Sequence, residues 1–164
     1  MGAILKTRII MGIDPALVKL GWAIVTKQSD RDKTVTWQTG TIQPKQDGVE
    51  RLKHIRDGIA VLAESAQPEL IVIEGYSFGS QFNGPALGEV GGVIRLALFE
   101  AGFKIAVVQP ASLKKFVTGS GRADKPTVRQ KIFKKWKGAE FDTQDEAEAF
   151  ALAQWGLARS LDDV

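Results

Sequence analysis

The segment that most constrains the fold of this chain is Leu-Ile-Val-Ile at positions 70–73, which has no polar face. It follows Pro68, a helix-ending residue, and runs directly into Glu74. Side chains alternate between the two faces of a strand, so an uninterrupted apolar run is buried on both faces, as in the middle of a helix-covered sheet. The run therefore predicts a strand at the centre of a sheet.

Four further segments have the character of strands and complete the expected sheet. Residues 9–14 form an apolar run that stops at Pro15, which cannot donate a hydrogen bond to a neighbouring strand. The links between the first three segments are short, which favours an antiparallel meander. The expected strands are 9–14, 20–26, 34–42, 70–74 and 104–108.

Helical periodicity accounts for most of the remaining chain. Pro110 suits the first turn of a helix, and Thr143 is a favourable N-cap residue. The element order predicts an α/β protein with a five-stranded mixed sheet flanked by helices, the order of the ribonuclease H-like fold, in one domain over residues 1–164. The expected helices are 48–66, 84–101, a short one from Pro110, 125–136 and 143–160.

The residue types that are missing narrow the possible chemistry. Cysteine is absent and His54 is the only histidine, which excludes disulfides, cysteine-based zinc sites and any site that needs two histidines. Chemistry must then come mainly from carboxylates, lysines, hydroxyls or a bound metal. No apolar run approaches the ~18 residues that span a bilayer, and residues 1–10 lack a signal-peptide pattern. We therefore expect a cytoplasmic protein with no membrane partner.

Four acidic residues stand where a cluster could form. Asp14 and Glu74 each end an apolar strand, so they project at one edge of the sheet if the two strands are neighbours. Asp145 and Glu148 are three residues apart on the last helix and therefore share a face. Each acid taken singly also fits an ordinary loop or helix-start residue, and the residue pattern leaves both interpretations open.

A cluster of these carboxylates would favour a hard divalent cation. Like charges within a few ångströms repel or raise each other's pKa, and Mg²⁺ or Mn²⁺ with oxygen ligands relieves that repulsion. Two such ions can activate a water and stabilise the leaving oxygen of a phosphodiester.

Residues 104–137 contain ten Lys or Arg and one acid, and residues 139–164 contain seven acids and one Arg. These blocks fit either two solvated faces or a phosphate-binding surface beside a metal site.

Several motifs resemble those of the RuvC family of Holliday junction resolvases. The resemblance extends from about residue 9 to residue 158, and the motifs are weak singly but specific in this order. They are GIDP at 12–15, GWAIV at 21–25, IVIE at 71–74, GEVGGV at 88–93, PASLKK at 110–115, TGSGRADK at 118–125 and DEAEAFALA at 145–153.

The resemblance implies a homodimer that binds a four-way junction in branched DNA and nicks two strands symmetrically. It also implies that Asp14, Glu74, Asp145 and Glu148 are catalytic metal ligands for Mg²⁺ or Mn²⁺, with two ions in each active site. Glu148 departs from the aspartate that is usual in the cellular enzymes, which leaves its detailed role open. Asp142 is a weaker alternative ligand. The compact, diverged chain is the basis for a hypothesis that it is a phage-type or mobile-element member.

The resemblance and the charge pattern together suggest the DNA contacts. The lysines at 131, 134, 135 and 137 fit a solvated helix equally well. Among the aromatic residues after Glu74, Phe78 is the first candidate for a wedge at the junction centre and Tyr76 the second, with packing inside the loop as the alternative. The candidate phosphate contacts are Lys114, Lys115, Arg122, Lys125 and Arg129.

The glycines at 84, 88, 91 and 92 lie in a predicted helix, where each costs roughly 1 kcal/mol. They indicate a close approach, either of the helix to the sheet or of two subunits, and we expect the subunit interface.

Rival functions are an ATPase of the actin and sugar-kinase superfamily, a non-catalytic junction-binding protein, and another ribonuclease H-like nuclease acting on flaps, hybrids or RNA. The ATPase would need a second domain, and the binding protein need not keep all four acids.

Overall fold

The five expected strands form one mixed sheet in the order β3-β2-β1-β4-β5. The structure is a computed structural model that describes residues 6–29, 31, 33–76 and 84–164. The first three strands form the predicted antiparallel meander, and β4 pairs in parallel with both β1 and β5. The strands are β1 Arg8–Asp14, β2 Leu20–Lys27, β3 Val35–Ile42, β4 Leu70–Glu74 and β5 Ile105–Val108.

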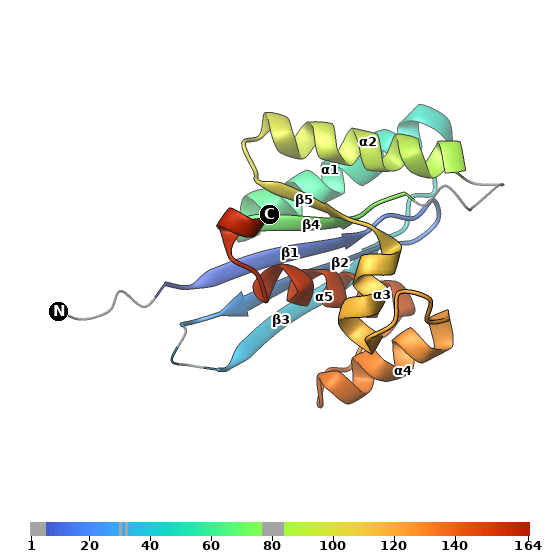
Figure 1. Cartoon of the computed structure of the whole chain (residues 1–164). Helices are drawn as coiled ribbons and strands as arrows, with labels where there is room; N and C mark the ends of the chain where they lie inside the picture. The colour runs from blue at the N-terminus through green and yellow to red at the C-terminus, as the bar shows by residue number, and fades with distance from the viewer. Residues whose placement is uncertain (1–5, 30, 32, 77–83) are drawn as a thin grey trace.

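Helices cover both faces of the sheet, as the apolar β4 predicted (Figure 1). Helices α1 and α2 lie on one face, and α5 lies on the other face with α3 and α4 packed against it. No helix of the described residues is both long and apolar enough to span a membrane. The helices are α1 Gly48–Ala66, α2 Gly84–Glu100, α3 Pro110–Thr118, α4 Lys125–Lys135, α5 Gln144–Leu157 and a short 3₁₀ turn, η1 Leu161–Asp163.

Strand alternation divides the interior into two cores. In β1, Met11 and Ile13 face α1 and α2, whereas Ile10 faces α5. In β4 the same alternation sends Ile71 and Ile73 to the first core and Leu70 and Val72 to the second. The side chains at even-numbered positions of β1 and β4 therefore point to the α5 face. Asp14 and Glu74 are the even-numbered last residues of these strands, so their side chains point to the same face.

Helix α5 lies unusually close to the sheet because glycines stand beneath it. A Cβ atom at Gly12 would overlap the carbonyl oxygen of Ala149 and lie 2.7 Å from the amide nitrogen of Ala153. A Cβ atom at Gly21 would overlap the backbone carbonyl of Asp145. The face of α5 toward the sheet carries small alanine side chains, and together with these strand glycines they make the close approach possible.

One expectation about the helices needs correction. The last helix ends at Leu157 and not at residue 160, because Ser160 has extended backbone angles and its hydroxyl caps the following 3₁₀ turn. Among the described residues, and apart from the backbone of α2 itself, a Cβ atom at Gly88, Gly91 or Gly92 would meet no atom within 4 Å, so these glycines do not bring α2 close to the sheet. His54 is exposed, and the ring of Trp37 packs against that of Phe150.

Candidate active site

Asp14 and Glu74 meet at one edge of the sheet because their strands are parallel neighbours. Ile13 pairs with Ile73, so each acid is the next residue of a paired register. Parallel strands present their carboxyl ends at the same edge, and the alternation described above turns both side chains toward α5. Asp14 is buried and Glu74 is partly buried.

The first turn of α5 brings the other two acids to the same place. Thr143 is the N-cap, as predicted, and its hydroxyl accepts a hydrogen bond of 3.2 Å from the amide of Glu146. Asp145 and Glu148 follow one turn apart, and the Gly21 contact seats the backbone of Asp145 on β2. All four acids line one cavity of about 860 Å³.

Glu148 is held from two sides within this cluster. Its carboxylate accepts a hydrogen bond of 2.8 Å from the side-chain amide of Gln144, one turn earlier on α5. It also shares a side-chain hydrogen bond with Asp14. The longer glutamate side chain therefore reaches across from the helix to the end of β1.

The acids in the cavity repel each other enough to resist ionisation. Burial, then the charges of Glu148 and Glu74, raise the pKa of Asp14 well above its usual range. Burial and then Glu148 raise the pKa of Glu74 to about 7, against the opposite effect of Lys125 and Lys114. The two lysines therefore compensate only part of the negative charge.

The oxygen donors of this cluster suit a hard divalent cation. Within the described residues, no three acidic side chains are already arranged as the ligands of one ion. A ligand carboxyl must be deprotonated, so the raised pKa values of Asp14 and Glu74 mean that ion binding releases protons from these two groups.

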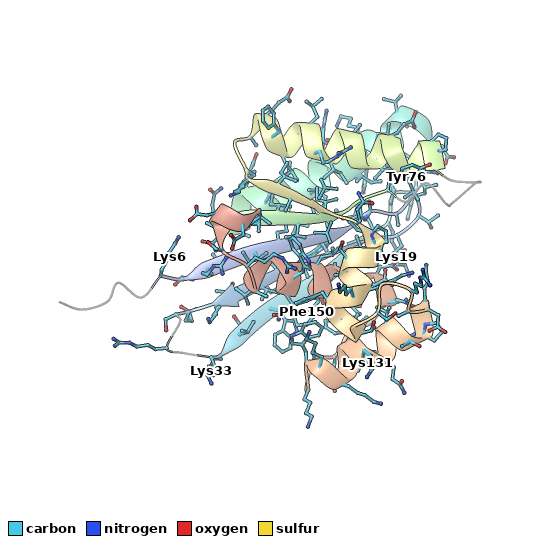
Figure 2. The ribbon with its side chains drawn as sticks, in the orientation of Figure 1. Lys6, Lys19, Lys33, Tyr76, Lys131 and Phe150 are labelled. Carbon is cyan, nitrogen blue, oxygen red and sulfur yellow. The ribbon has the colours of Figure 1, made fainter. Side chains whose placement is uncertain are left out.

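Several residues that sequence reasoning missed line the same cavity, among them Lys19, Arg95 and Gln109. Lys19 lies in the loop between β1 and β2, and Figure 2 shows it with Tyr76 at one end of the molecule, far from Lys6 and Lys33. The hairpin of β1 and β2 could have placed Lys19 near the acids. Gly21 pairs with Asp14, so the loop between them must lie at that edge of the sheet. Arg95 and Gln109 carried no such signal.

The structure separates the candidate DNA contacts into groups. Lys114, Lys125 and the half-exposed Tyr76 line the cavity with the acids. Arg129 lines a neighbouring hollow that shares Lys125, whereas Lys115 and Arg122 are exposed and line neither. Phe78 lies outside the described residues.

Asp142, the alternative ligand, is exposed and does not line the cavity. It precedes the helix, and its backbone amide donates a hydrogen bond of 3.3 Å to the side chain of Glu146. Its position before the N-cap keeps it away from the face of α5 that carries the other acids. The structure therefore does not bring Asp142 into the cluster.

Glu74 gives the metal-free protein a pH-dependent stability. Its pKa rises from 4.5 to about 7 on folding, so the folded protein retains a proton that the unfolded chain releases. Stability is therefore greatest below about pH 4.5 with respect to this group, and it falls as the pH rises to about 7. The upper limit of the change is on the order of 3 kcal/mol, since water reaches part of the side chain.

Urea unfolding in EDTA between pH 5 and pH 8 measures this effect. Wild type should lose stability across the interval, and Glu74→Gln should give a shallower curve. The raised pKa of Asp14 also makes stability fall as the pH rises. The plot of stability against pH for Glu74→Gln should therefore not become flat. A wild-type stability that increases from pH 5 to pH 7 would contradict the strained carboxylate cluster.

Comparison with known proteins supplies the family. The model of the RuvC family, described as crossover junction endodeoxyribonuclease RuvC, matches residues 10–154. This chain belongs to the RuvC family. The match runs from β1 into α5 and so includes all four acids of the cavity.

Curated RuvC proteins resemble the chain over most of their length. The protein from Azorhizobium caulinodans, named crossover junction endodeoxyribonuclease RuvC, is 36% identical over 147 residues, which are 88% of this chain and 86% of that protein. The protein of the same name from Zymomonas mobilis is 30% identical over 146 residues, 88% of this chain and 87% of its own. The phage or mobile-element origin, which rests on the compact and diverged chain, stays a prediction.

Solved structures show the same ribonuclease H-like fold. Thermus thermophilus RuvC superposes with a TM-score of 0.72 at 24% identity, covering 88% of this chain and 90% of that one. The same protein in complex with its Holliday junction substrate gives 0.74 at 23% identity, with coverages of 89% and 90%. The fowlpox virus resolvase bound to Holliday junction DNA gives 0.58 at 17% identity, with coverages of 92% and 97%.

Proposed function

We propose that this chain, as a single nuclease domain, is a structure-specific endodeoxyribonuclease that resolves four-way junctions by symmetric, metal-dependent hydrolysis of phosphodiesters. The observation that carries the proposal is the cavity in which Asp14, Glu74, Asp145 and Glu148 lie beside Lys114 and Lys125. Four acids and flanking cations fit a metal-assisted reaction on a polyanion, and the chain is a RuvC family member. DNA recombination, repair or phage DNA processing in the cytoplasm is the setting we propose.

In this proposal the four acids are the metal ligands. Mg²⁺ or Mn²⁺, two ions in each site, would lower the pKa of an attacking water and stabilise the leaving oxygen. Through the ions that they hold, the acids would place the scissile phosphate between β1, β4 and α5, and Lys114 and Lys125 would bind the neighbouring phosphates. Gln144 holds the carboxylate of Glu148 toward the cluster.

The proposed DNA surface is Lys114, Lys115, Arg122, Lys125 and Arg129, with Phe78 and Tyr76 as the aromatic residues nearest the junction centre. Lys114→Ala tests it, because each lysine that neutralises a phosphate adds about one unit to the slope of log K against log salt. We expect weaker junction binding at low salt and a slope smaller by about 1. An unchanged slope, measured by fluorescence anisotropy at several salt concentrations, removes Lys114 from the contact surface.

We also propose that two copies pair through α2. One face of α2 combines Gly88, Gly91 and Gly92, where an added Cβ would meet no described atom within 4 Å beyond the helix backbone, with Leu96 and Phe99, which are 58% and 73% exposed. Such a face lets a second helix come close and covers exposed apolar surface.

Sedimentation velocity tests the dimer with Leu96→Glu. We expect wild type to sediment as a dimer and the variant as a monomer, because a carboxylate would be buried without a partner in the interface. Val49→Glu, a change at an exposed valine of α1, is the control and should leave the mass unchanged. A dimeric Leu96→Glu would place the interface elsewhere.

Cleavage of matched DNA substrates tests the function as a whole. A synthetic four-way junction, its linear duplex, a flap and an RNA–DNA hybrid are compared at equal concentration, with Mg²⁺ and with EDTA. We expect paired symmetric nicks in the junction, little cleavage of duplex, and none in EDTA. Preference for flap or hybrid would favour another ribonuclease H-like nuclease, and cleavage in EDTA would exclude the metal mechanism.

A further inference from the structure

A second hollow, of about 370 Å³, adjoins the proposed catalytic cavity and is here called the α4 hollow. Lys125 lines both spaces, so the two meet at that residue. The proposed reaction uses Lys125 and Arg129 as phosphate contacts and Gln144 as a partner of Glu148, and it gives no role to Pro126, Gln130 or Phe133. The lining residues are Lys125, Pro126, Arg129, Gln130, Phe133 and Gln144.

Phe133 presents a rigid aromatic surface in this hollow. Its side chain is 38% exposed, and its ring lies 6.0 Å from that of Phe141, which lies 5.0 Å from that of Phe150. Phe150 is fully buried between α5 and the sheet and is labelled in Figure 2. Because the chain of rings anchors Phe133 to the core, stacking on it costs little side-chain entropy.

Cations extend from this aromatic ring toward the acids. Lys125, Arg129 and Phe133 recur every four residues of α4 and so share one face, with about 6 Å of helix rise between successive members. Lys125 and Arg129 are exposed, and neither forms an ion pair with an acid among the described residues. Two unpaired cations followed by an aromatic ring suit a strand of nucleic acid, whose phosphates and bases alternate.

Gln144 connects the hollow to the catalytic cluster. It is the first residue of α5 and lines the α4 hollow, while its amide donates the hydrogen bond of 2.8 Å to Glu148. No other residue lining the α4 hollow makes a side-chain hydrogen bond to one of the four acids among the described residues.

We propose that the α4 hollow is a nucleotide subsite for the DNA strand that enters the catalytic cavity. A base next to the scissile phosphate stacks on Phe133, Lys125 and Arg129 bind the flanking phosphates, and Gln144 is a positioning residue that acts through Glu148. This inference rests on the proposed nuclease function, because it takes the substrate to be a DNA strand.

The stacking step is tested with 2-aminopurine, a base whose fluorescence falls when it stacks. The probe is placed in turn at each nucleotide around the scissile phosphate of a junction, bound to full-length protein carrying Asp14→Asn to prevent cleavage. One position should be quenched, and Phe133→Leu, which keeps an apolar contact with Phe141, should relieve the quenching and weaken binding roughly tenfold. Phe133→Trp should keep both the quenching and the binding affinity. Lys134→Ala, a change on the same helix outside the hollow, is the matched control.

The positioning step is tested by Mn²⁺ binding, measured by calorimetry, and by kinetics. Gln144→Ala should weaken Mn²⁺ binding about tenfold and lower kcat while leaving KM for the junction unchanged. If Gln144 acts through Glu148, the same change in a Glu148→Asp background should have a much smaller effect, since the shorter side chain is out of reach.

Three results overturn the subsite. They are unchanged quenching in Phe133→Leu, wild-type Mn²⁺ affinity in Gln144→Ala, and equal effects of Gln144→Ala in both backgrounds. A wild-type protein that cleaves flaps or hybrids in preference to junctions contradicts the proposed function instead. In that case the same probes are placed in the preferred substrate, and the same three results decide whether the subsite exists.

Discussion

Asp14→Asn is expected to lower the single-turnover rate of junction cleavage by at least about a thousandfold while junction binding is retained. A loss of this size corresponds to about 4 kcal/mol of transition-state stabilisation, the amount that a displaced metal ion accounts for. The same variant should melt at a higher temperature than wild type in EDTA at pH 8. The reason is that burial and three neighbouring carboxylates raise the pKa of Asp14, so its ionisation opposes folding above the usual carboxyl range.

A slower cleavage together with a higher melting temperature in Asp14→Asn separates a catalytic role of Asp14 from a structural one. Asp142→Asn makes the same chemical change at an exposed acid outside the cavity, and both its cleavage rate and its melting temperature should match wild type. At acid pH, where Asp14 is protonated in folded and unfolded states alike, the stabilising effect of Asp14→Asn should disappear. A variant that is inactive and also less stable in EDTA would show that Asp14 has a structural role that the cavity does not account for.

Gly12→Ala is expected to destabilise the protein by more than about 3 kcal/mol, a large part of the 5–15 kcal/mol that stabilises a typical domain. The added Cβ would overlap the carbonyl oxygen of Ala149 and approach the amide nitrogen of Ala153. Both atoms belong to the backbone of α5, so only a movement of the whole helix could make room. That movement would also carry Asp145 and Glu148 away from Asp14 and Glu74.

Urea unfolding in EDTA measures the loss, and Gly58→Ala is the matched control. A Cβ at Gly58 would meet only the end of the Ile42 side chain, at 2.8 Å, which can rotate away, and alanine favours the helix. We expect a change within about 1 kcal/mol there. If Gly12→Ala unfolds at the same urea concentration as wild type, the close seating of α5 on β1 is not what holds the acids together.

The strands, most helix limits and the four clustered acids were predictable from the sequence because their signals are local. The apolar run before Glu74 requires a strand covered on both faces, and a parallel neighbour brings Asp14 to the same edge. The Thr143 cap sets the start of α5, so the spacing of Asp145 and Glu148 places both on one turn. Each inference used alternation, helical period or capping, which depend on residues only a few positions apart.

What only the tertiary structure decided is which distant side chains share the cavity and its neighbouring hollow. Arg95 comes from α2 and Gln109 from the end of β5, and no local pattern relates either to the acids. The roles of the glycines also needed the structure. Gly12 and Gly21 lie under α5, whereas an added Cβ at Gly88 or Gly91 would meet no described atom within 4 Å outside the backbone of α2.

The physical reason lies in the different ranges of the two kinds of interaction. Backbone periodicity and capping are determined by neighbours along the chain, so the sequence by itself determined the elements and the edge at which the acids lie. The hydrogen bond from Gln144 to Glu148, the anchoring of Phe133 through Phe141 and the seating of α5 on Gly12 depend on side-chain rotamers and on the distance between packed layers. Those are set only when segments far apart in the sequence come into contact.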